Sequence, residues 1–333
     1  MNFSPILKNR EVIKAISPAL RFDGKSDVAA WQTEARAKLS DLLGLGYIDK
    51  CDPEFEILST STTDAYTEYC FKLQSESNFY FTSTLRVPSG ASGKLPVAIC
   101  LKGSSDDLLA ALSDDSDLGR NMCTRALNEG YCAMVVETRN FDECFLAHDL
   151  IPEEMEKRVT WCACYRSSMR SLMLSRTTTG ERVWDLMCAI DALLAHFDFV
   201  DETAITLIGN NACASVAYYA AAIDERISAV AVTGGVCSYE HSIIANNLCI
   251  CGYIPNISNY FEMGDIGGLI APRKLVVFSN KDDKYYPACG VKDAFELTKV
   301  VYDALGASDN CKMQIMDEAA VFYADEAWKE LHK

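Results

Sequence analysis

Residues 204–222 have the sequence Ala204-Ile205-Thr206-Leu207-Ile208-Gly209-Asn210-Asn211-Ala212-Cys213-Ala214-Ser215-Val216-Ala217-Tyr218-Tyr219-Ala220-Ala221-Ala222, and this stretch decides the fold. Its first five residues are mostly β-branched or apolar, which predicts a short buried strand. The small residues after Cys213 predict a closely packed helix, and the five residues between predict a tight turn. A strand, a sharp turn and a helix in that order is a unit of sheets whose strands are joined by helices.

The same alternation continues on both sides of this stretch. From Lys94 onward, apolar strands alternate with amphipathic helices, which is typical of a parallel sheet covered on both faces. Strands are predicted at 96–101, 131–136, 204–208, 227–232, 273–278 and 312–316, and helices at 118–130, 181–196, 291–305 and 325–331.

The N-terminal part has a different pattern. Residues 27–43 carry apolar side chains at helical spacing, and Gly44 and Gly46 end this predicted helix. Residues 54–87 are rich in Thr, Tyr, Phe and Ser, which predicts antiparallel strands with turns near 62–64 and 76–78. We therefore expect an α/β fold with a mixed, mostly parallel sheet of about eight strands. No linker divides the chain, so we expect one domain over 1–333, with a helical segment at 1–50 and an irregular insertion at 237–270 over the sheet edge.

The charge of the chain bears on its partners. The 333 residues carry a formal net charge of −16, and a surface of that sign repels nucleic-acid phosphates and anionic lipid. The first ten residues lack the apolar run of a secretory signal, and no stretch approaches the roughly 20 apolar residues of a membrane helix. We therefore expect a cytoplasmic protein that binds neither nucleic acid nor membranes.

Fifteen cysteines are scattered along the chain without a regular framework. In a chain without an export signal they indicate buried thiols in a reducing compartment. Two local pairs, Cys162 with Cys164 and Cys249 with Cys251, are of the residue type that binds metals. Their single intervening residue is not the spacing of common zinc knuckles, and the four histidines do not cluster with them. We expect no metal and no cofactor.

Several blocks of sequence resemble the α/β-hydrolase superfamily, in the branch of acetyl xylan esterase-like and dienelactone hydrolase-like esterases. The blocks are Gly180-Glu181-Arg182-Val183-Trp184-Asp185, Ala189-Ile190-Asp191, Ala221-Ala222-Ile223-Asp224-Glu225-Arg226-Ile227, Tyr260-Phe261-Glu262-Met263-Gly264-Asp265, Leu269-Ile270-Ala271-Pro272-Arg273 and Phe322-Tyr323-Ala324-Asp325-Glu326-Ala327-Trp328. Residues 137–141 resemble the Arg-x-Phe loop of the same family. In this superfamily the strand, turn and helix form the nucleophile elbow, G-x-S-x-G. The resemblance implies an α/β-hydrolase fold with its elbow at 209–213.

The resemblance also implies where a catalytic triad would lie. Asn211 stands at the nucleophile position, Asp283 at the acid position and Ala320 at the histidine position. A carboxamide is neither nucleophilic nor ionisable, and alanine cannot act as a base. The triad is therefore predicted to be incomplete. Asparagine tolerates positive φ better than most residues, so we expect the elbow to keep its backbone shape without its chemistry.

Other positions around the elbow are candidates for binding or catalysis. The resemblance places the oxyanion-hole amides at Gly103 or Ser104 and at Ala212. Cys213 is the alternative nucleophile, because its thiol lies beside the turn; the opposing interpretation is a side chain that points into the core. His241, within the insertion, is either a base that faces the pocket or a surface loop residue.

Three functions remain open from the sequence. The first is an esterase-like protein that has lost hydrolysis and retains a small-molecule pocket or a protein-interaction role. The second is an active carboxylic-ester hydrolase with an unconventional nucleophile or base. The third is a structural subunit that assembles through its acidic surface. We favour the first, with a small-molecule ligand as partner, because two of the three triad positions are replaced.

Overall fold

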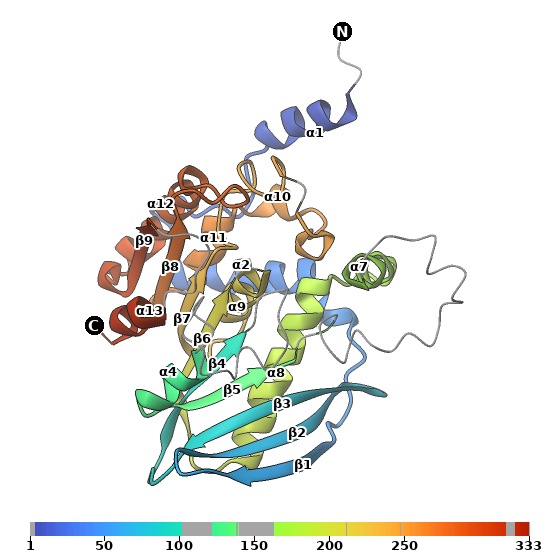
Figure 1. Cartoon of the computed structure of the whole chain (residues 1–333). Helices are drawn as coiled ribbons and strands as arrows, with labels where there is room; N and C mark the ends of the chain where they lie inside the picture. Colours follow the sequence, from blue (N-terminus) through green and yellow to red (C-terminus); the bar gives the residue numbers. More distant parts are fainter. Residues whose placement is uncertain are drawn as a thin grey trace.

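The computed structural model describes residues 4–101, 122–137, 139, 163–210, 212–246, 248–317 and 324–332. A single mixed sheet forms the centre of this part (Figure 1), with the strand order β1-β2-β3-β5-β4-β6-β7-β8-β9. The described residues thus form nine strands, where the sequence predicted about eight. The strands are β1 (Phe55–Thr62), β2 (Tyr66–Glu76), β3 (Phe79–Pro88), β4 (Leu95–Leu101), β5 (Cys132–Val136), β6 (Val200–Asn210), β7 (Ile227–Thr233), β8 (Lys274–Asn280) and β9 (Cys311–Met316).

The sheet has an antiparallel part and a parallel part. Strands β1, β2 and β3 form successive hairpins, and β3 pairs antiparallel with β5. Strands β5, β4, β6, β7, β8 and β9 pair in parallel. The predicted antiparallel strands at 54–87 and the parallel strands from residue 94 onward are therefore confirmed.

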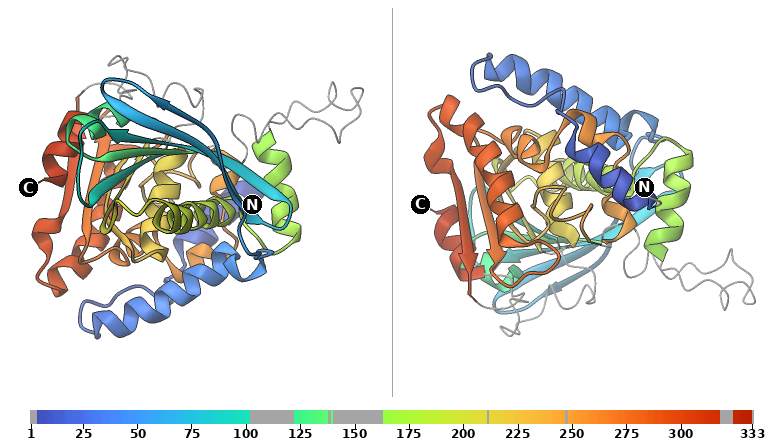
Figure 2. Two further views of the ribbon diagram at one scale, coloured as in Figure 1. Left: turned by 90° about the horizontal axis from the view of Figure 1, so that it is seen from below. Right: turned by 90° about the horizontal axis from the view of Figure 1, so that it is seen from above.

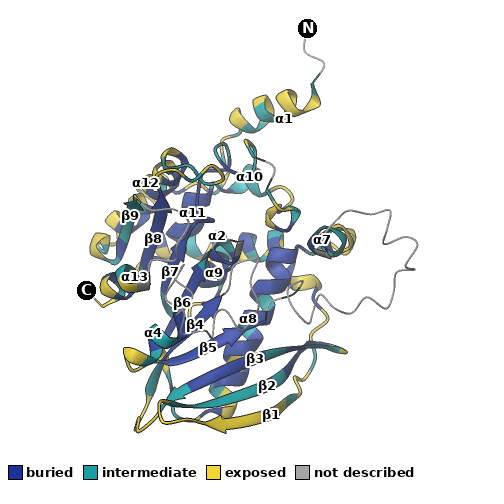
Figure 3. Cartoon of the chain, viewed as in Figure 1, coloured by how far each residue is buried: buried dark blue, intermediate teal, exposed yellow. Residues whose placement is uncertain are grey.

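Helices cover both faces of the sheet. In β4 the side chains of Val97, Ile99 and Leu101 belong to one core cluster, whereas Ala98 and Cys100 belong to another, and all five are fully buried. Helices α2 (Val28–Leu43), α8 (Thr178–His196), α9 (Ala212–Ile223) and α12 (Ala288–Ala304) contribute to the first cluster, and α4 (Met122–Asn128) and α13 (Ala324–Leu331) to the second. Figure 2 shows the helices on either side of the strands, and Figure 3 shows the buried central strands beside the exposed β1.

Local signals explain where the helices begin and end. The Asp27 side chain accepts a hydrogen bond from the Ala30 N–H at the start of α2, and Gly44 ends that helix at φ +80°. Helix α8 begins at Thr178, three residues before the predicted start. The reason is Thr177, whose Oγ1 accepts a hydrogen bond from the Gly180 N–H. This N-cap stabilises the first turn, although Thr178, Thr179 and Gly180 have low helix propensity.

The segment 237–270 contains more regular structure than the irregular loop predicted. It holds the 3₁₀ helix η3 (Ile250–Gly252) and the helices α10 (Ile257–Tyr260) and α11 (Met263–Gly268). Helix α11 packs against α9 and α12. A Cβ on Gly267 would lie 2.2 Å from Tyr218 Oη, so only glycine permits this close approach. The glycine-rich sequence, which suggested a loop, instead allows a short helix to pack tightly.

The remaining elements lie at the periphery. They are α1 (Pro5–Lys14), η1 (Leu45–Tyr47), α7 (Ala163–Met173) and η4 (Ser308–Asn310). Helix α1 has no buried residue and extends away from the sheet (Figure 1). Helix α7 was not predicted from the sequence. No helix in the described part of the chain is both long enough and apolar enough to cross a membrane.

Candidate functional site

The candidate site lies where the parallel strands end. Pairing places Leu101 of β4 beside Gly209 of β6, and Asn210 beside Thr233 of β7. On the other side, Asn280 of β8 pairs with Met316 of β9. These strands therefore end at one edge of the sheet, which is where ligands bind in open α/β folds.

The turn after β6 is built for close packing. A Cβ on Gly209 would lie 2.8 Å from Ala217 Cβ and 2.9 Å from both Ala214 Cα and Cys213 O. Glycine therefore lets the end of β6 lie directly against α9. Such a sharp connection between strand and helix fits the predicted elbow at 209–213.

Of the predicted elbow residues, the structure describes Ala212 and Cys213 but not Asn211. Asn211, at the nucleophile position, lies outside the described residues, so its predicted positive φ stays a prediction. Ala212, a predicted oxyanion-hole residue, is the first residue of α9. Cys213, the alternative nucleophile, is only 1% exposed and belongs to the main core cluster. Its burial favours the interpretation that this thiol points into the core.

Asp283, at the acid position, lies in the loop between β8 and α12. Its Oδ1 accepts hydrogen bonds from the backbone N–H groups of Tyr285, at 2.8 Å, and of Tyr286, at 2.9 Å. An aspartate that accepts from amides two and three residues ahead forms a local turn. The carboxylate therefore stabilises the shape of its own loop.

None of the three histidines within the described ranges forms a hydrogen bond or an ion pair with Asp283. His196 stacks on Phe55 with 3.9 Å between the ring centres. The Nδ1 atom of His241 lies 2.9 Å from Ser238 Oγ and 3.5 Å from Asp293 Oδ2. His332 lies beside α4 and α13, where its Nε2 is 3.2 Å from Tyr131 Oη. His241 therefore pairs with its own loop and with α12, and its side chain is 38% exposed.

Three further predicted positions lie outside the described residues. They are Ala320 at the histidine position and the oxyanion-hole candidates Gly103 and Ser104. The structure therefore describes Asp283, Cys213 and the start of α9 at Ala212, and the other positions stay predictions from the resemblance.

A cavity of about 60 Å³ lies beside α9, the helix that follows the predicted elbow. Its wall includes Ser215 and Tyr219 of α9, Tyr239 after β7 and Tyr286 from the Asp283 loop. The hydroxyl oxygens of Tyr219 and Tyr239 lie 3.3 Å apart. Burial raises the pKa of Tyr219 and of Tyr286 to about 12, so both phenols stay protonated near neutral pH. They can donate and accept hydrogen bonds there but are poorly suited to act as bases.

Two cysteines on the wall of this cavity belong to a cluster of three. Cys249 and Cys251 flank Ile250 of η3, and their sulfurs lie 3.0 Å apart, while Cys164 Sγ of α7 lies 3.4 Å from Cys249 Sγ. All three sulfurs fall within 4.8 Å of one another. Hydrogen bonding with Cys164 and Cys251 lowers the pKa of Cys249, and the contact with Cys249 raises that of Cys164.

In the sequence these cysteines form two separate local pairs, Cys162 with Cys164 and Cys249 with Cys251. Cys164 and Cys249 are 85 positions apart, and no spacing rule connects them. Cys162, the other member of the first pair, lies outside the described residues. The signal in the sequence was the pair Cys249-x-Cys251, but this pair does not identify Cys164 as the third member of the cluster.

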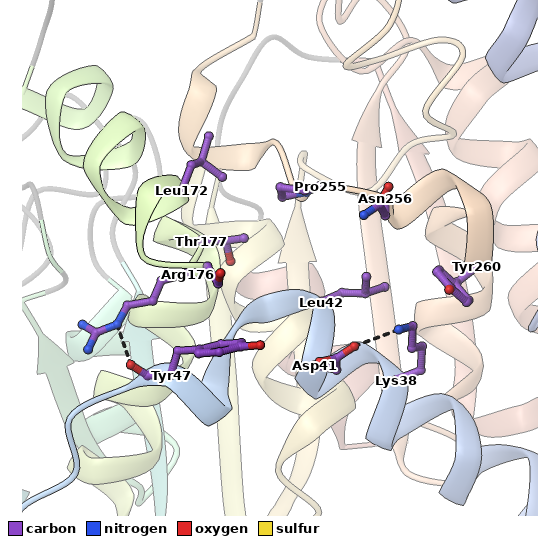
Figure 4. Close-up of a pocket in the computed structure, with 11 residues that line it drawn as sticks. Lys38, Asp41, Leu42, Tyr47, Leu172, Arg176, Thr177, Pro255, Asn256 and Tyr260 are labelled. Atoms are coloured by element: carbon purple, nitrogen blue, oxygen red, sulfur yellow. Dashed lines mark hydrogen bonds and ion pairs between the residues drawn. The ribbon is translucent and has the colours of Figure 1, made fainter.

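A larger cavity of about 310 Å³ lies apart from the elbow, among α2, α10 and the turn between α7 and α8 (Figure 4). Its charged groups are already paired. Lys38 Nζ lies 2.7 Å from Asp41 Oδ2 and 4.4 Å from the centre of the Tyr260 ring, and Arg176 donates to the Tyr47 carbonyl oxygen at 2.8 Å. No predicted site residue lines this cavity.

A buried ionic network joins the hairpin strands to α8. Arg139 lies within the predicted Arg-x-Phe loop, and its guanidinium binds Asp185 of α8 and Glu76 of β2. Arg176 binds the second oxygen of Glu76 at 2.7 Å. Two blocks that resemble the esterase family are thus joined by a structural ion pair.

Comparisons with known proteins agree with this architecture. No protein-family model matches the chain. YtaP of Bacillus subtilis (strain 168), which is named as a hydrolase, is 29% identical over 144 residues, or 41% of this chain and 47% of that protein. The chain therefore matches about half the length of this relative.

Solved structures match over nearly the whole chain. A Bacteroides fragilis protein named as an acetyl xylan esterase superposes with a TM-score of 0.76 at 15% identity, over 98% of this chain and 85% of that one. A glucuronoyl esterase from Solibacter usitatus superposes with a TM-score of 0.68 at 15% identity, over 95% and 97% of the two chains. The chain therefore has the α/β-hydrolase fold, in the form found in acetyl xylan esterase-like and glucuronoyl esterase structures.

Proposed function

We propose that this chain is an esterase-like protein that does not hydrolyse esters and that keeps a small-molecule pocket beside the elbow. The observation that carries the proposal is the set of hydrogen-bond partners of the Asp283 carboxylate. Its carboxylate accepts hydrogen bonds from the amides of its own loop, and no hydrogen bond or ion pair joins it to a histidine in the described part of the chain. In a working triad the acid orients an imidazole and stabilises its charged form.

The sequence at the other two triad positions supports this proposal. Asn211 offers no nucleophilic oxygen, and Ala320 offers no base. When triad members are removed from serine proteases, a residual acceleration of about 10³- to 10⁴-fold over water remains, from binding and oxyanion stabilisation. Any turnover by this chain is expected at or below that level.

The cavity beside α9 supports the binding part of the proposal. Tyr219, Tyr239 and Tyr286 line it, and each presents an apolar ring with a polar tip. Since the phenols of Tyr219 and Tyr286 stay protonated near neutral pH, the cavity of about 60 Å³ suits one small polar group of a ligand, held by hydrogen bonds, rather than a whole ligand. Ligand pockets of α/β folds commonly lie at this edge of the sheet.

One observation favours the second candidate function, an active carboxylic-ester hydrolase. Cys249 is an exposed thiol on the wall of the same cavity, and its neighbouring thiols lower its pKa. A thiolate at this position is an unconventional nucleophile that comes from the segment 237–270.

Turnover of short-chain p-nitrophenyl esters separates the two functions. The proposal expects the purified wild-type chain and the Asn211→Ala variant to be equally slow, whereas activity well above that variant would reject the proposal. A Cys249→Ser variant, assayed beside them, tests the alternative nucleophile: loss of turnover in this variant alone would establish the second function.

A restored triad gives the complementary test. The double variant Asn211→Ser with Ala320→His, with and without Cys213→Gly, is expected to gain esterase activity if only the triad has been lost. Thermal unfolding of each variant serves as the control for folding. If the double variant folds and stays inactive, the pocket has changed along with the triad.

A further inference from the structure

The three-cysteine cluster is a metal-binding geometry that lies outside the predicted triad. Its sulfurs come from Cys164 of α7, from Cys249 directly before η3 and from Cys251 within η3, and α7 packs against η3. The 3.0 Å and 3.4 Å separations between Sγ atoms are much longer than a disulfide bond of about 2.05 Å. Zinc–sulfur bonds of about 2.3 Å place thiolates of one site about 3.8 Å apart, so the sulfurs need to move outward only slightly.

A buried positive charge lies beside the cluster. Arg182 is only 1% exposed, and its Nη2 lies 3.7 Å from Cys164 Sγ. A permanent positive charge at that distance favours the thiolate over the thiol. Three thiolates around a divalent ion carry one net negative charge, and the Arg182 guanidinium neutralises it inside the protein.

The cluster also has a route for an ion and room for a further ligand. Cys164 and Cys251 are buried, whereas Cys249 is exposed. The cavity of about 60 Å³ touches Cys249 and Cys251. No histidine or carboxylate of the described residues joins the three sulfurs, and the cavity leaves room for water or a small ligand at the fourth position of a tetrahedral site.

We propose that Cys164, Cys249 and Cys251 bind one Zn²⁺ ion, with an exogenous fourth ligand on the side of the cavity. Three thiolates are soft ligands that select zinc over the hard cations Mg²⁺ and Ca²⁺. The ion links α7 to the segment 237–270. This site does not depend on the proposed loss of hydrolysis, but a Cys249 thiolate bound to zinc would not be free to act as the nucleophile of the second candidate function.

The test uses the full-length protein, reduced with a phosphine, treated with a chelator and kept free of oxygen. Equilibrium dialysis with elemental analysis is expected to find one Zn²⁺ per chain. Cd²⁺ added in its place is expected to produce the ultraviolet charge-transfer band of cadmium thiolates. The Cys249→Ser variant is expected to lose Zn²⁺ affinity by about 100-fold or more, because it removes one of three protein ligands.

Two controls keep the result interpretable. Cys289 is exposed and lies outside the cluster, so Cys289→Ser is expected to bind zinc as the wild type does. Zinc is expected to raise the thermal midpoint of the wild type and of Cys289→Ser, and not that of Cys249→Ser. Far-ultraviolet circular dichroism checks the folding of each variant. Since Cys249 is exposed, its serine variant decides the matter even if Cys164→Ser fails to fold.

Three results would overturn the proposal. The first is unchanged zinc stoichiometry and affinity in folded Cys249→Ser protein. The second is the absence of a cadmium thiolate band in the wild type. The third is a disulfide between Cys249 and Cys251, found by peptide mapping of the zinc-treated protein, because disulfide sulfurs are not thiolate ligands.

Discussion

Arg139 and Asp185 form a buried ion pair with two parallel hydrogen bonds. Arg139 Nε lies 2.7 Å from Asp185 Oδ2, and Nη2 lies 2.8 Å from Oδ1, although the residues are 46 positions apart. Burial raises the pKa of Asp185, and the charge of Arg139 opposes that shift. The pair fastens the loop after β5 to α8, so its role is to hold the fold rather than to react.

Removal of one partner of this ion pair is expected to destabilise the folded protein strongly. Asp185→Ala leaves the guanidinium of Arg139 buried beside fewer acids, and we expect a loss of about 3–5 kcal/mol in the free energy of unfolding. The matched control on the same helix is Asp191→Ala, whose partnership with Arg226 is exposed to solvent and is expected to contribute at most about 1 kcal/mol. Urea unfolding of both variants measures the difference. Equal losses would contradict a structural role for the buried pair.

Gly209→Ala is expected to destabilise the elbow. The added Cβ would lie 2.9 Å from Ala214 Cα and Cys213 O, so the end of β6 and the start of α9 must move apart. Overpacking of this kind costs about 1–3 kcal/mol. Gly46→Ala is the control, because a Cβ there has no atom within 4 Å and Gly46 does not have positive φ. In thermal and urea unfolding, the Gly209→Ala variant should be clearly less stable than the Gly46→Ala variant. Equal stability would mean that the turn has space to relax.

Asp265 makes the stability of the fold depend on pH. Burial raises the pKa of its carboxyl to about 6 from 3.8 in the unfolded chain, and the hydrogen bond from the Glu262 N–H opposes this shift. Between these two pH values the folded state binds more protons than the unfolded state. The contribution of Asp265 to stability therefore improves as pH falls from above 6 toward 3.8, by up to about 3 kcal/mol.

The comparison that isolates this effect is Asp265→Asn, which keeps an acceptor for the Glu262 N–H. The difference in the free energy of unfolding between wild type and variant, measured at pH 7 and pH 5, is expected to shift in favour of the wild type at the lower pH. A difference that is constant over this range would contradict a raised pKa at Asp265.

Cysteine labelling tests whether Cys213 is available as a nucleophile. Since Cys213 is 1% exposed and Cys289 is exposed, brief treatment of the folded protein with iodoacetamide is expected to modify Cys289 and leave Cys213 intact. Treatment in urea should modify both. Peptide mapping by mass spectrometry identifies the sites. Rapid labelling of Cys213 in the folded protein would instead support the interpretation of this thiol as a reactive group.

The sequence predicts the architecture well where local pattern and burial agree. The run Pro96–Leu101 is apolar throughout, and β4 is buried on both faces of the sheet. The helix at 27–43 carries both periodic apolar residues and a terminal glycine, and α2 matches it to within one residue. In contrast, α11 was missed because Gly264, Gly267 and Gly268 suggest a loop, and only packing against α9 and α12 explains them.

The candidate site could be predicted only in part. The positions of the triad came from resemblance, and the turn formed by Asp283 follows from its own sequence, because aspartate often accepts from amides two residues ahead. The cysteine cluster could not be predicted, since it depends on the packing of α7 against η3. Long-range juxtaposition of this kind leaves no periodic signal in the sequence.

The hydrogen bonds within the Asp283 loop have a consequence for how such proteins evolve. Because this aspartate makes two hydrogen bonds that hold its own loop, stability alone favours the residue whether or not a histidine partner exists. Its retention is therefore weak evidence of retained activity in any lineage that shares the loop. If the proposed function is correct, a descendant that regains a nucleophile and an imidazole would find the acid already in place, so the proposed loss of hydrolysis would be easier to reverse than a missing triad suggests.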